Sequence, residues 1–158
     1  NALAHYDLGI SLSNLGQNDR AERELEVAST VEPWFSRAYV ARGIALARMG
    51  QLSPAIESLT SAIKIDANDF DALYNRGNIF GATGELTRAR EDLVKAAALE
   101  PHNAEVHEAL GTLAWHSGDT TNAVAEYKRA LELDPNSADA REALDKLSHN
   151  EATDPDSQ

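Results

Sequence analysis

The sequence has no cysteine, a single methionine, and aromatic residues at only 6% of its 158 positions. Without cysteine the chain forms no disulfide, no thiolate metal site and no cysteine nucleophile. Such a composition fits the cytoplasm, which we favour, and does not exclude the bacterial periplasm. Long apolar runs are also missing, because none reaches the roughly 18 residues that suggest a transmembrane helix. We therefore expect no direct insertion into a membrane.

Positive charge is scarce as well. Lys and Arg number 14 against 26 Asp and Glu, which gives a formal net charge of −12. A protein that binds nucleic acid needs a basic face to displace the counterions of phosphate, and anionic membrane surfaces attract basic segments. The charge balance argues against both kinds of partner, and the length predicts one domain.

The chain does contain a repeat of 34 residues. Two series of glycines have this spacing, namely Gly9, Gly43, Gly77 and Gly111, and Gly16, Gly50, Gly84 and Gly118. If Ala2 is position 1 of a unit, positions 20 and 27 are always alanine, and position 24 is leucine or, in the last unit, tyrosine. A fixed period of this length is typical of repeat proteins. The units are residues 2–35, 36–69, 70–103 and 104–137.

Each unit has the pattern of two helices. In the third unit, Leu73, Gly77 and Phe80 have the spacing of one face of an amphipathic helix. The glycine at position 15 of every unit ends this first helix, because glycine readily adopts the left-handed conformation found at helix C-termini. A second helix fills the remainder of the unit.

Capping residues indicate where the helices begin. Asp19 and its counterparts at position 18 predict the N-cap of the second helix. Asp69, Asn103 and Ser137, at position 34, predict the N-cap of the first helix in the next unit. Asn1 falls on this same position, so we expect the full-length protein to continue upstream.

These positions resemble the tetratricopeptide repeat (TPR) family. Its unit has Leu-Gly at positions 7–8, alanine at 20 and 27, a bulky residue at 24 and proline at 32. Leu8-Gly9 and Leu110-Gly111 match the pair, and proline occupies position 32 in three of the four units. The resemblance implies an all-α fold, a right-handed α-solenoid of four helix-turn-helix repeats.

Several residues depart from the family pattern, among them Ala67 at the proline position 32. Arg42 and Arg76 replace the leucine at position 7, and Ala114 is small where position 11 is otherwise Leu or Phe.

Beyond the last unit, residues 138–147 continue the first-helix pattern with Ala140, Leu144 and Leu147. A solenoid end needs a helix that covers its last apolar surface. We therefore expect a C-terminal capping helix over 138–147 and a TPR domain over 1–147. Residues 148–158 lack apolar periodicity and predict a disordered acidic tail.

The motifs that suggest chemistry are incomplete. His107-Glu108 begins like the helix of a zinc protease, but Gly111 stands where the second histidine is required. Residues 66–71 have the composition of a calcium loop, but Phe70 occupies a ligand position. We expect no metal site and no cofactor, and we predict that the chain is not an enzyme.

The resemblance implies that the first helices line a concave groove for a peptide or helical segment of a partner protein. Positions 2, 5, 6, 9, 12 and 13 supply the predicted groove residues: Tyr6, Ile10, Asn14, Arg37, Ile44, Arg48, Tyr74, Asn75, Asn78, Glu105, Glu108, Thr112, Trp115 and His116. The Lys and Asn clamp with which one TPR subgroup grips the carboxyl terminus of chaperones is absent. Arg37 and Arg48 favour an acidic group of the partner, and Glu105 and Glu108 favour a basic one.

Two alternatives to a groove-binding scaffold remain open. Trp34 and Phe35 are adjacent in a turn between units, where they either pack locally or form a contact of a self-assembling homo-oligomer. The second alternative is that the chain is the docking or regulatory domain of a larger protein whose other part is missing.

Overall fold

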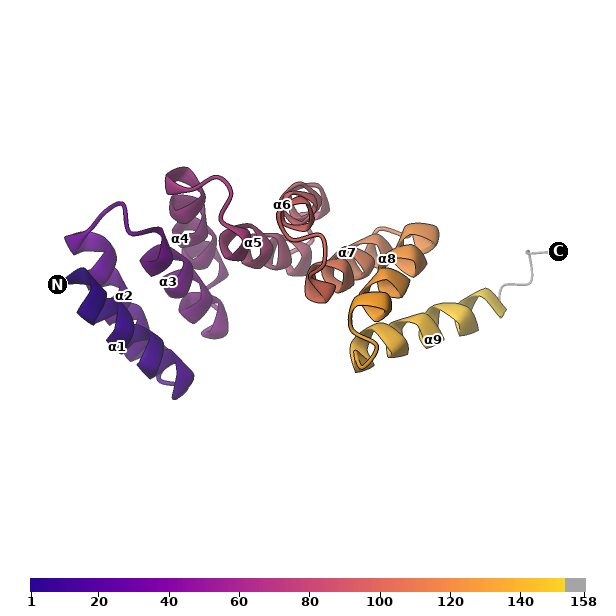
Figure 1. Ribbon diagram of the computed structural model, residues 1–158, viewed down its shortest axis with the longest axis horizontal. Coiled ribbons are helices and arrows are strands. Elements are labelled where there is room, and N and C mark those ends of the chain that lie inside the picture. The colour runs from indigo at the N-terminus through magenta and orange to yellow at the C-terminus, as the bar shows by residue number, and fades with distance from the viewer. Residues whose placement is uncertain (153–158) are drawn as a thin grey trace.

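The computed structural model describes residues 1–152, and every regular element in this range is a helix. The helices are α1 (Ala2–Asn14), α2 (Asn18–Val31), α3 (Ser36–Arg48), α4 (Leu52–Ile65), α5 (Phe70–Ala82), α6 (Leu86–Leu99), α7 (Ala104–His116), α8 (Thr120–Leu133) and α9 (Ala138–Ala152). Figure 1 shows that they form successive hairpins along the long axis, with α9 at the C-terminal end. The prediction of an all-α helical solenoid is confirmed.

The glycine at position 15 allows each hairpin to turn. Gly16, Gly50, Gly84 and Gly118 have φ values of 74°, 74°, 81° and 79°. This left-handed conformation is strained for residues with a Cβ atom, so the prediction that these glycines end the first helices is confirmed.

The predicted caps are right for the first helices and wrong for the second. Asp69 Oδ1 accepts a hydrogen bond from the backbone N–H of Ala72, and Asn103 Oδ1 accepts one from Glu105. The second helices begin earlier than predicted, with N-caps at position 16 and not at position 18. Among the four residues at position 16, Asp119 caps its helix with its side chain, because its Oδ1 accepts a hydrogen bond from the backbone N–H of Asn122. The turn after the glycine is shorter than the capping pattern suggested.

The two helices of each hairpin approach closely at position 8. A Cβ atom on Gly9 or Gly43 would lie 2.6 Å from Cγ of Leu25 or Leu59, respectively. The leucines are fully buried, at 0% exposure. Glycine is therefore required at position 8 because the side chain at position 24 fills the space where its own side chain would be.

Helix α9 is longer than predicted. It extends to Ala152, so residues 148–152 are helical, which corrects that part of the predicted tail. Neither glycine nor proline occurs between Ala138 and Ala152, so nothing in the chain interrupts the helix. Residues 153–158, also assigned to the tail, lie outside the described residues. Ala140 and Leu147 are buried against α8, as expected of a capping helix.

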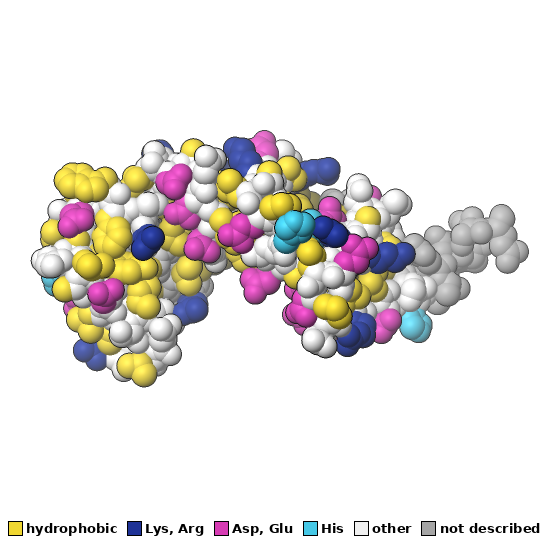
Figure 2. All heavy atoms as spheres, in the orientation of Figure 1, with side chains coloured by type: hydrophobic (Ala, Val, Ile, Leu, Met, Phe, Trp, Pro, Cys, Tyr) yellow, Lys and Arg dark blue, Asp and Glu magenta, His cyan; other side chains and the backbone are white. Residues whose placement is uncertain are grey.

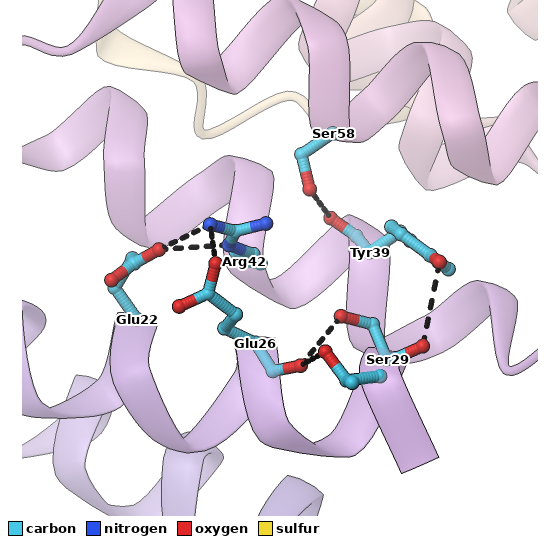
Figure 3. A network of polar contacts seen from close by, with 7 residues as sticks. Glu22, Glu26, Ser29, Tyr39, Arg42 and Ser58 are labelled. Carbon is cyan, nitrogen blue, oxygen red and sulfur yellow. Dashed lines mark hydrogen bonds and ion pairs between the residues drawn. The ribbon is translucent and has the colours of Figure 1, made fainter. Parts of the chain in front are cut away.

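The arginines at position 7 connect neighbouring hairpins. Arg42 of α3 binds Glu22 and Glu26 of α2, with Nη2–Oε1 distances of 2.7 and 2.8 Å. Figure 3 shows this cluster together with Ser58 of α4, whose hydroxyl donates to the carbonyl oxygen of Tyr39 at 2.9 Å. These contacts run from α2 through α3 to α4, so polar bonds replace the apolar contact that leucine makes in the family pattern.

Arg76 bridges the next junction through Thr60 of α4 and also binds Asp92 of α6 within its own hairpin. Its Nε and Nη2 atoms donate to the two carboxylate oxygens of Asp92 in α6 at 2.7 and 2.9 Å, and Nη1 donates to Thr60 of α4 at 2.9 Å. Asp92 is 3% exposed, so this bidentate pair is buried. Phe80 packs below the guanidinium groups of both Arg76 and Arg88.

The junction between the third and fourth hairpins is less well filled. A cavity of about 300 Å³ opens between α6, α7 and α8, and Leu86, Val94, Leu110 and Ala114 are among its lining residues. We call it the junction hollow. At the position of Ala114, the third unit has Phe80, which is 1% exposed. The small side chain of Ala114 therefore leaves space that a larger residue occupies elsewhere.

The close approach at position 8 gives a prediction with an internal control. Gly77→Ala places a Cβ atom 2.8 Å from Cγ of Leu93, so we expect it to lower the free energy of unfolding by about 1–3 kcal/mol. Gly81→Ala, on the same helix, meets its nearest atoms at 4.0 Å and should be neutral or stabilising by up to about 1 kcal/mol. Urea unfolding followed by circular dichroism measures both. Equal effects of the two substitutions would contradict the packing explanation.

Filling the junction hollow should stabilise the protein. We expect Ala114→Leu to raise the free energy of unfolding by about 1 kcal/mol, because it buries apolar surface in existing space. The matched control is Ala125→Leu on the exposed face of α8, which should change stability by less than about 0.5 kcal/mol. A loss of stability for Ala114→Leu in urea melts would show that the hollow has no room for the side chain.

Candidate functional site

The first helices and α9 together line two hollows. The N-terminal hollow, about 370 Å³, lies between α1 and α3 and reaches the start of α5. The C-terminal hollow, about 560 Å³, is formed by α5, α7, α8 and α9. In Figure 2, hydrophobic side chains gather over the α1–α3 end of the molecule, and acidic side chains are spread over its middle.

Most of the predicted groove residues line one hollow or the other. The N-terminal hollow contains Tyr6, Ile10, Asn14, Arg37, Ile44 and Arg48. The C-terminal hollow contains Tyr74, Asn78, Glu108, Thr112, Trp115 and His116. Asn75 and Glu105 line neither. The side-chain amide of Asn75 donates to the carbonyl oxygen of Asp71 at 2.7 Å, within its own helix.

The N-terminal hollow has an apolar floor and charges of both signs. Ile10, Val40 and Ile44 supply apolar surface. Arg48 Nη1 donates to the hydroxyl of Ser13 at 2.8 Å, which links α3 to α1. Arg37 shares the hollow with Asp71, which the sequence analysis did not include among the site residues.

The carboxylates change the electrostatics expected of this hollow. Burial raises the pKa of Asp71, and the neighbouring carboxylates of Asp69 and Glu100 raise it further. Negative charge is therefore already concentrated beside the arginines, so the hollow is not a simple receptor for an acidic group.

The C-terminal hollow combines aromatic side chains with hydrogen-bonded polar groups. Tyr127, from the second helix α8, lies with its hydroxyl 2.8 Å from the Thr112 hydroxyl. Glu108 Oε1 accepts a hydrogen bond from the Ser137 hydroxyl, at the start of α9. Trp115 is half-buried on the same wall.

Helix α9 provides the wall that sequence reasoning missed. Asp139, Glu142 and Lys146 line the C-terminal hollow, and Lys146 Nζ lies 2.6 Å from Glu142 Oε1. These residues occupy positions 2, 5 and 9 if the repeat numbering is continued into α9. Extending the groove positions beyond the fourth unit is the signal that would have found them.

Burial, and to a lesser extent neighbouring carboxylates, raise the pKa of both tyrosines of the C-terminal hollow. Desolvation raises the pKa of Tyr74, and the carboxylates of Glu105 and Glu108 raise it further, against a hydrogen bond with Asn78 that lowers it. The pKa of Tyr127 is raised by desolvation and by Glu108, against its hydrogen bond with Thr112.

The two adjacent aromatic residues in the turn between α2 and α3, Trp34 and Phe35, have different environments. The ring of Phe35 lies 5.0 Å from that of Tyr6, centroid to centroid, so Phe35 packs locally. Trp34 is 72% exposed.

Two of the five histidines each pair with a glutamate of the same hairpin. His107 Nδ1 lies 2.8 Å from Glu126 Oε2, and His5 Nδ1 lies 2.7 Å from Glu24 Oε2. Among the described residues, no three His, Asp or Glu side chains gather as a metal site would require. No helix in the described part of the chain combines the length and the apolar content needed to cross a bilayer.

The chain is similar to a known repeat family and to several solved structures. A family model described as tetratricopeptide repeat matches residues 74–138, and one described as TPR repeat matches residues 43–84. No curated protein sequence matches the chain.

Among solved structures, MamA 41-end from Desulfovibrio magneticus RS-1 is 20% identical, with a TM-score of 0.88 over 96% of this chain and 85% of that one. The pilF protein of Pseudomonas aeruginosa is 21% identical, with a TM-score of 0.88 over 96% and 69% of the two chains. A chain of the APC/C hetero-tetramer Cut9–Hcn1 is 18% identical, with a TM-score of 0.87 over 93% of this chain and 30% of that one. At these identities the likeness shows the fold alone.

The electrostatics of the C-terminal hollow can be measured through its tyrosines. We expect Tyr74 and Tyr127 to ionise above the usual pKa of about 10, so their tyrosinate absorbance should appear at higher pH than that of exposed tyrosine. Glu108→Gln should lower both pKa values because it removes a negative charge that disfavours tyrosinate. Tyr74→Phe and Tyr127→Phe assign the signals, and Glu132→Gln on the exposed face of α8 is the control. An unchanged titration in Glu108→Gln would contradict the assigned cause.

Proposed function

Because the chain belongs to the tetratricopeptide repeat family, whose members are generally non-enzymatic scaffolds for protein–protein interaction, we propose that its two hollows bind a segment of a partner protein. The hollows lie along the first helices, where an extended strand or a helix can lie across several units. The observation that carries the proposal is the unfilled apolar surface in both, with Ile10, Val40 and Ile44 in one and Trp115 in the other.

The polar groups around the apolar surface suit recognition of a peptide. Arg48 and Asn14 line the first hollow, and Asn78 and Thr112 line the second. Such groups hydrogen-bond to a ligand while the apolar floor contributes binding energy. Large aromatic side chains in a concave surface are frequent hot spots of protein interfaces. Trp115 is therefore the expected anchor of the C-terminal hollow.

Random-peptide selection on immobilised protein supplies ligands for a test. Peptides that bind are measured by calorimetry against wild type, Arg48→Glu and Trp115→Ala. We expect Trp115→Ala to weaken binding by about 2 kcal/mol, the loss typical of a hot spot. Arg48→Glu should weaken those peptides that occupy the N-terminal hollow.

Two matched variants control for nonspecific effects. Arg23→Glu makes the same charge change on an exposed position of α2, and Trp34→Ala removes the exposed tryptophan in the turn. Both should leave affinity unchanged. Peptides whose affinity is insensitive to Arg48→Glu and Trp115→Ala would show that the hollows are not the binding surface.

A self-assembling scaffold is the second candidate function, and the exposure of Trp34 favours it. Leu3 and Leu8 of α1 are also exposed, at 55% and 46%, so apolar surface is present on the first helix and in the turn after α2. Light scattering over a concentration series distinguishes the candidates. An oligomer that Trp34→Ala dissociates would support self-assembly, whereas a monomer at every concentration would exclude it. A docking or regulatory role within a larger protein uses the same hollows and predicts the same peptide results.

A further inference from the structure

The C-terminal hollow has more carboxylates than its cations neutralise. Glu108 of α7 and Asp139 and Glu142 of α9 line it. Lys146 is paired with Glu142. Among the described side chains, no Lys or Arg lies within ion-pairing distance of Glu108 or Asp139. Two carboxylates from different helices therefore face the same hollow without a cationic partner.

Aromatic rings accompany these carboxylates. Tyr74, Trp115 and Tyr127 line the hollow from three helices. The face of an aromatic ring attracts a cation, and a carboxylate forms charge-assisted hydrogen bonds with guanidinium or ammonium groups. Leu113 and Ala143 add apolar surface, along which the aliphatic part of a long basic side chain can lie. The carboxylates and aromatic rings therefore suit the charged group of a basic side chain, and the apolar surface suits its aliphatic part.

The N-terminal hollow lacks this imbalance. Its lining includes Arg37 and Arg48 as well as Asp69 and Asp71, so both signs are equally represented. The excess of carboxylates is therefore local to the C-terminal hollow and does not simply follow from the net charge of the chain.

We propose that the C-terminal hollow holds one basic side chain, arginine or lysine, of the partner segment. This inference rests on the proposed function, because it assigns partner chemistry to one half of the same surface. The positive group lies between the carboxylates of Glu108 and Asp139, and its aliphatic stem packs against Trp115. An acidic or purely apolar residue of the partner does not fit this charge distribution.

The test uses the peptides selected on the wild-type protein. We expect arginine or lysine to recur at one position among peptides whose binding depends on Trp115. The double variant Glu108→Gln, Asp139→Asn should weaken such a peptide about ten-fold or more. Glutamine keeps an oxygen that accepts from Ser137, and asparagine keeps a polar residue in the first turn of α9. Circular dichroism and urea melts verify that the variant is folded.

A charge-matched control separates a local effect from the overall field. Glu57→Gln, Glu91→Gln removes two exposed carboxylates of α4 and α6 that do not line the hollow, and it should change the affinity less than two-fold. A peptide analogue with glutamine in place of the basic residue completes a double-mutant cycle. Its affinity should be the same for wild type and the Glu108→Gln, Asp139→Asn variant.

Each outcome decides between the inference and the function on which it rests. Peptides that need Trp115 but contain no basic residue, or that bind the double variant as tightly as wild type, overturn the inference and leave the groove function standing. Equal losses of affinity in the two charge variants overturn the inference, because they show that the net negative charge of the whole protein attracts the peptide. Peptides whose affinity is unchanged by both Trp115→Ala and Arg48→Glu overturn the groove function itself.

Discussion

The close approach of two helices within each hairpin is the constraint on which the solenoid depends. Position 8 has no side chain, and the residue at position 24 of the second helix fills the space next to it. In the fourth hairpin Tyr127 replaces leucine there, and a Cβ atom on Gly111 would still lie only 3.0 Å from its ring. The larger ring also carries its hydroxyl to Thr112, in the C-terminal hollow. A packing residue of the hairpin thereby also lines the C-terminal hollow.

The contacts between hairpins vary much more than the contacts within them. Two junctions are connected by arginine, through the bonds of Arg42 to Glu22 and of Arg76 to Thr60, while Leu110 stands at that position in the third. Arg76 also forms a buried ion pair with Asp92 inside its own hairpin, and two hydrogen bonds satisfy both groups. The junction hollow lies where the apolar contact is combined with the small Ala114. Substitutions at Arg42 and Ala114 therefore alter how neighbouring units pack, whereas Arg76 takes part in contacts both within and between hairpins.

The hairpins could be predicted from the sequence because the repeat presents each packing contact four times. Position 8, the turn glycine and the caps Asp69 and Asn103 follow from local rules. The second-helix caps were placed wrongly, since Ser, Thr and Asp at position 18 resemble caps but lie inside the first turn. Asp71 and the residues of α9 that line the C-terminal hollow occupy groove positions of the repeat, so their place in the surface follows once the numbering is continued beyond the fourth unit. The distances between side chains of different hairpins depend on the angle between successive hairpins, which no periodicity in one chain specifies.

The position of α9 has a consequence for how the solenoid ends. A capping helix must cover the last apolar surface, and Ala140 and Leu147 do so. Because α9 also repeats the first-helix pattern, the face that continues the groove positions carries Asp139, Glu142 and Lys146. These side chains give the capping helix a polar outer face. By the same placement they add charged groups to the C-terminal hollow. One helix thus both ends the repeat array and contributes charged side chains to the C-terminal hollow.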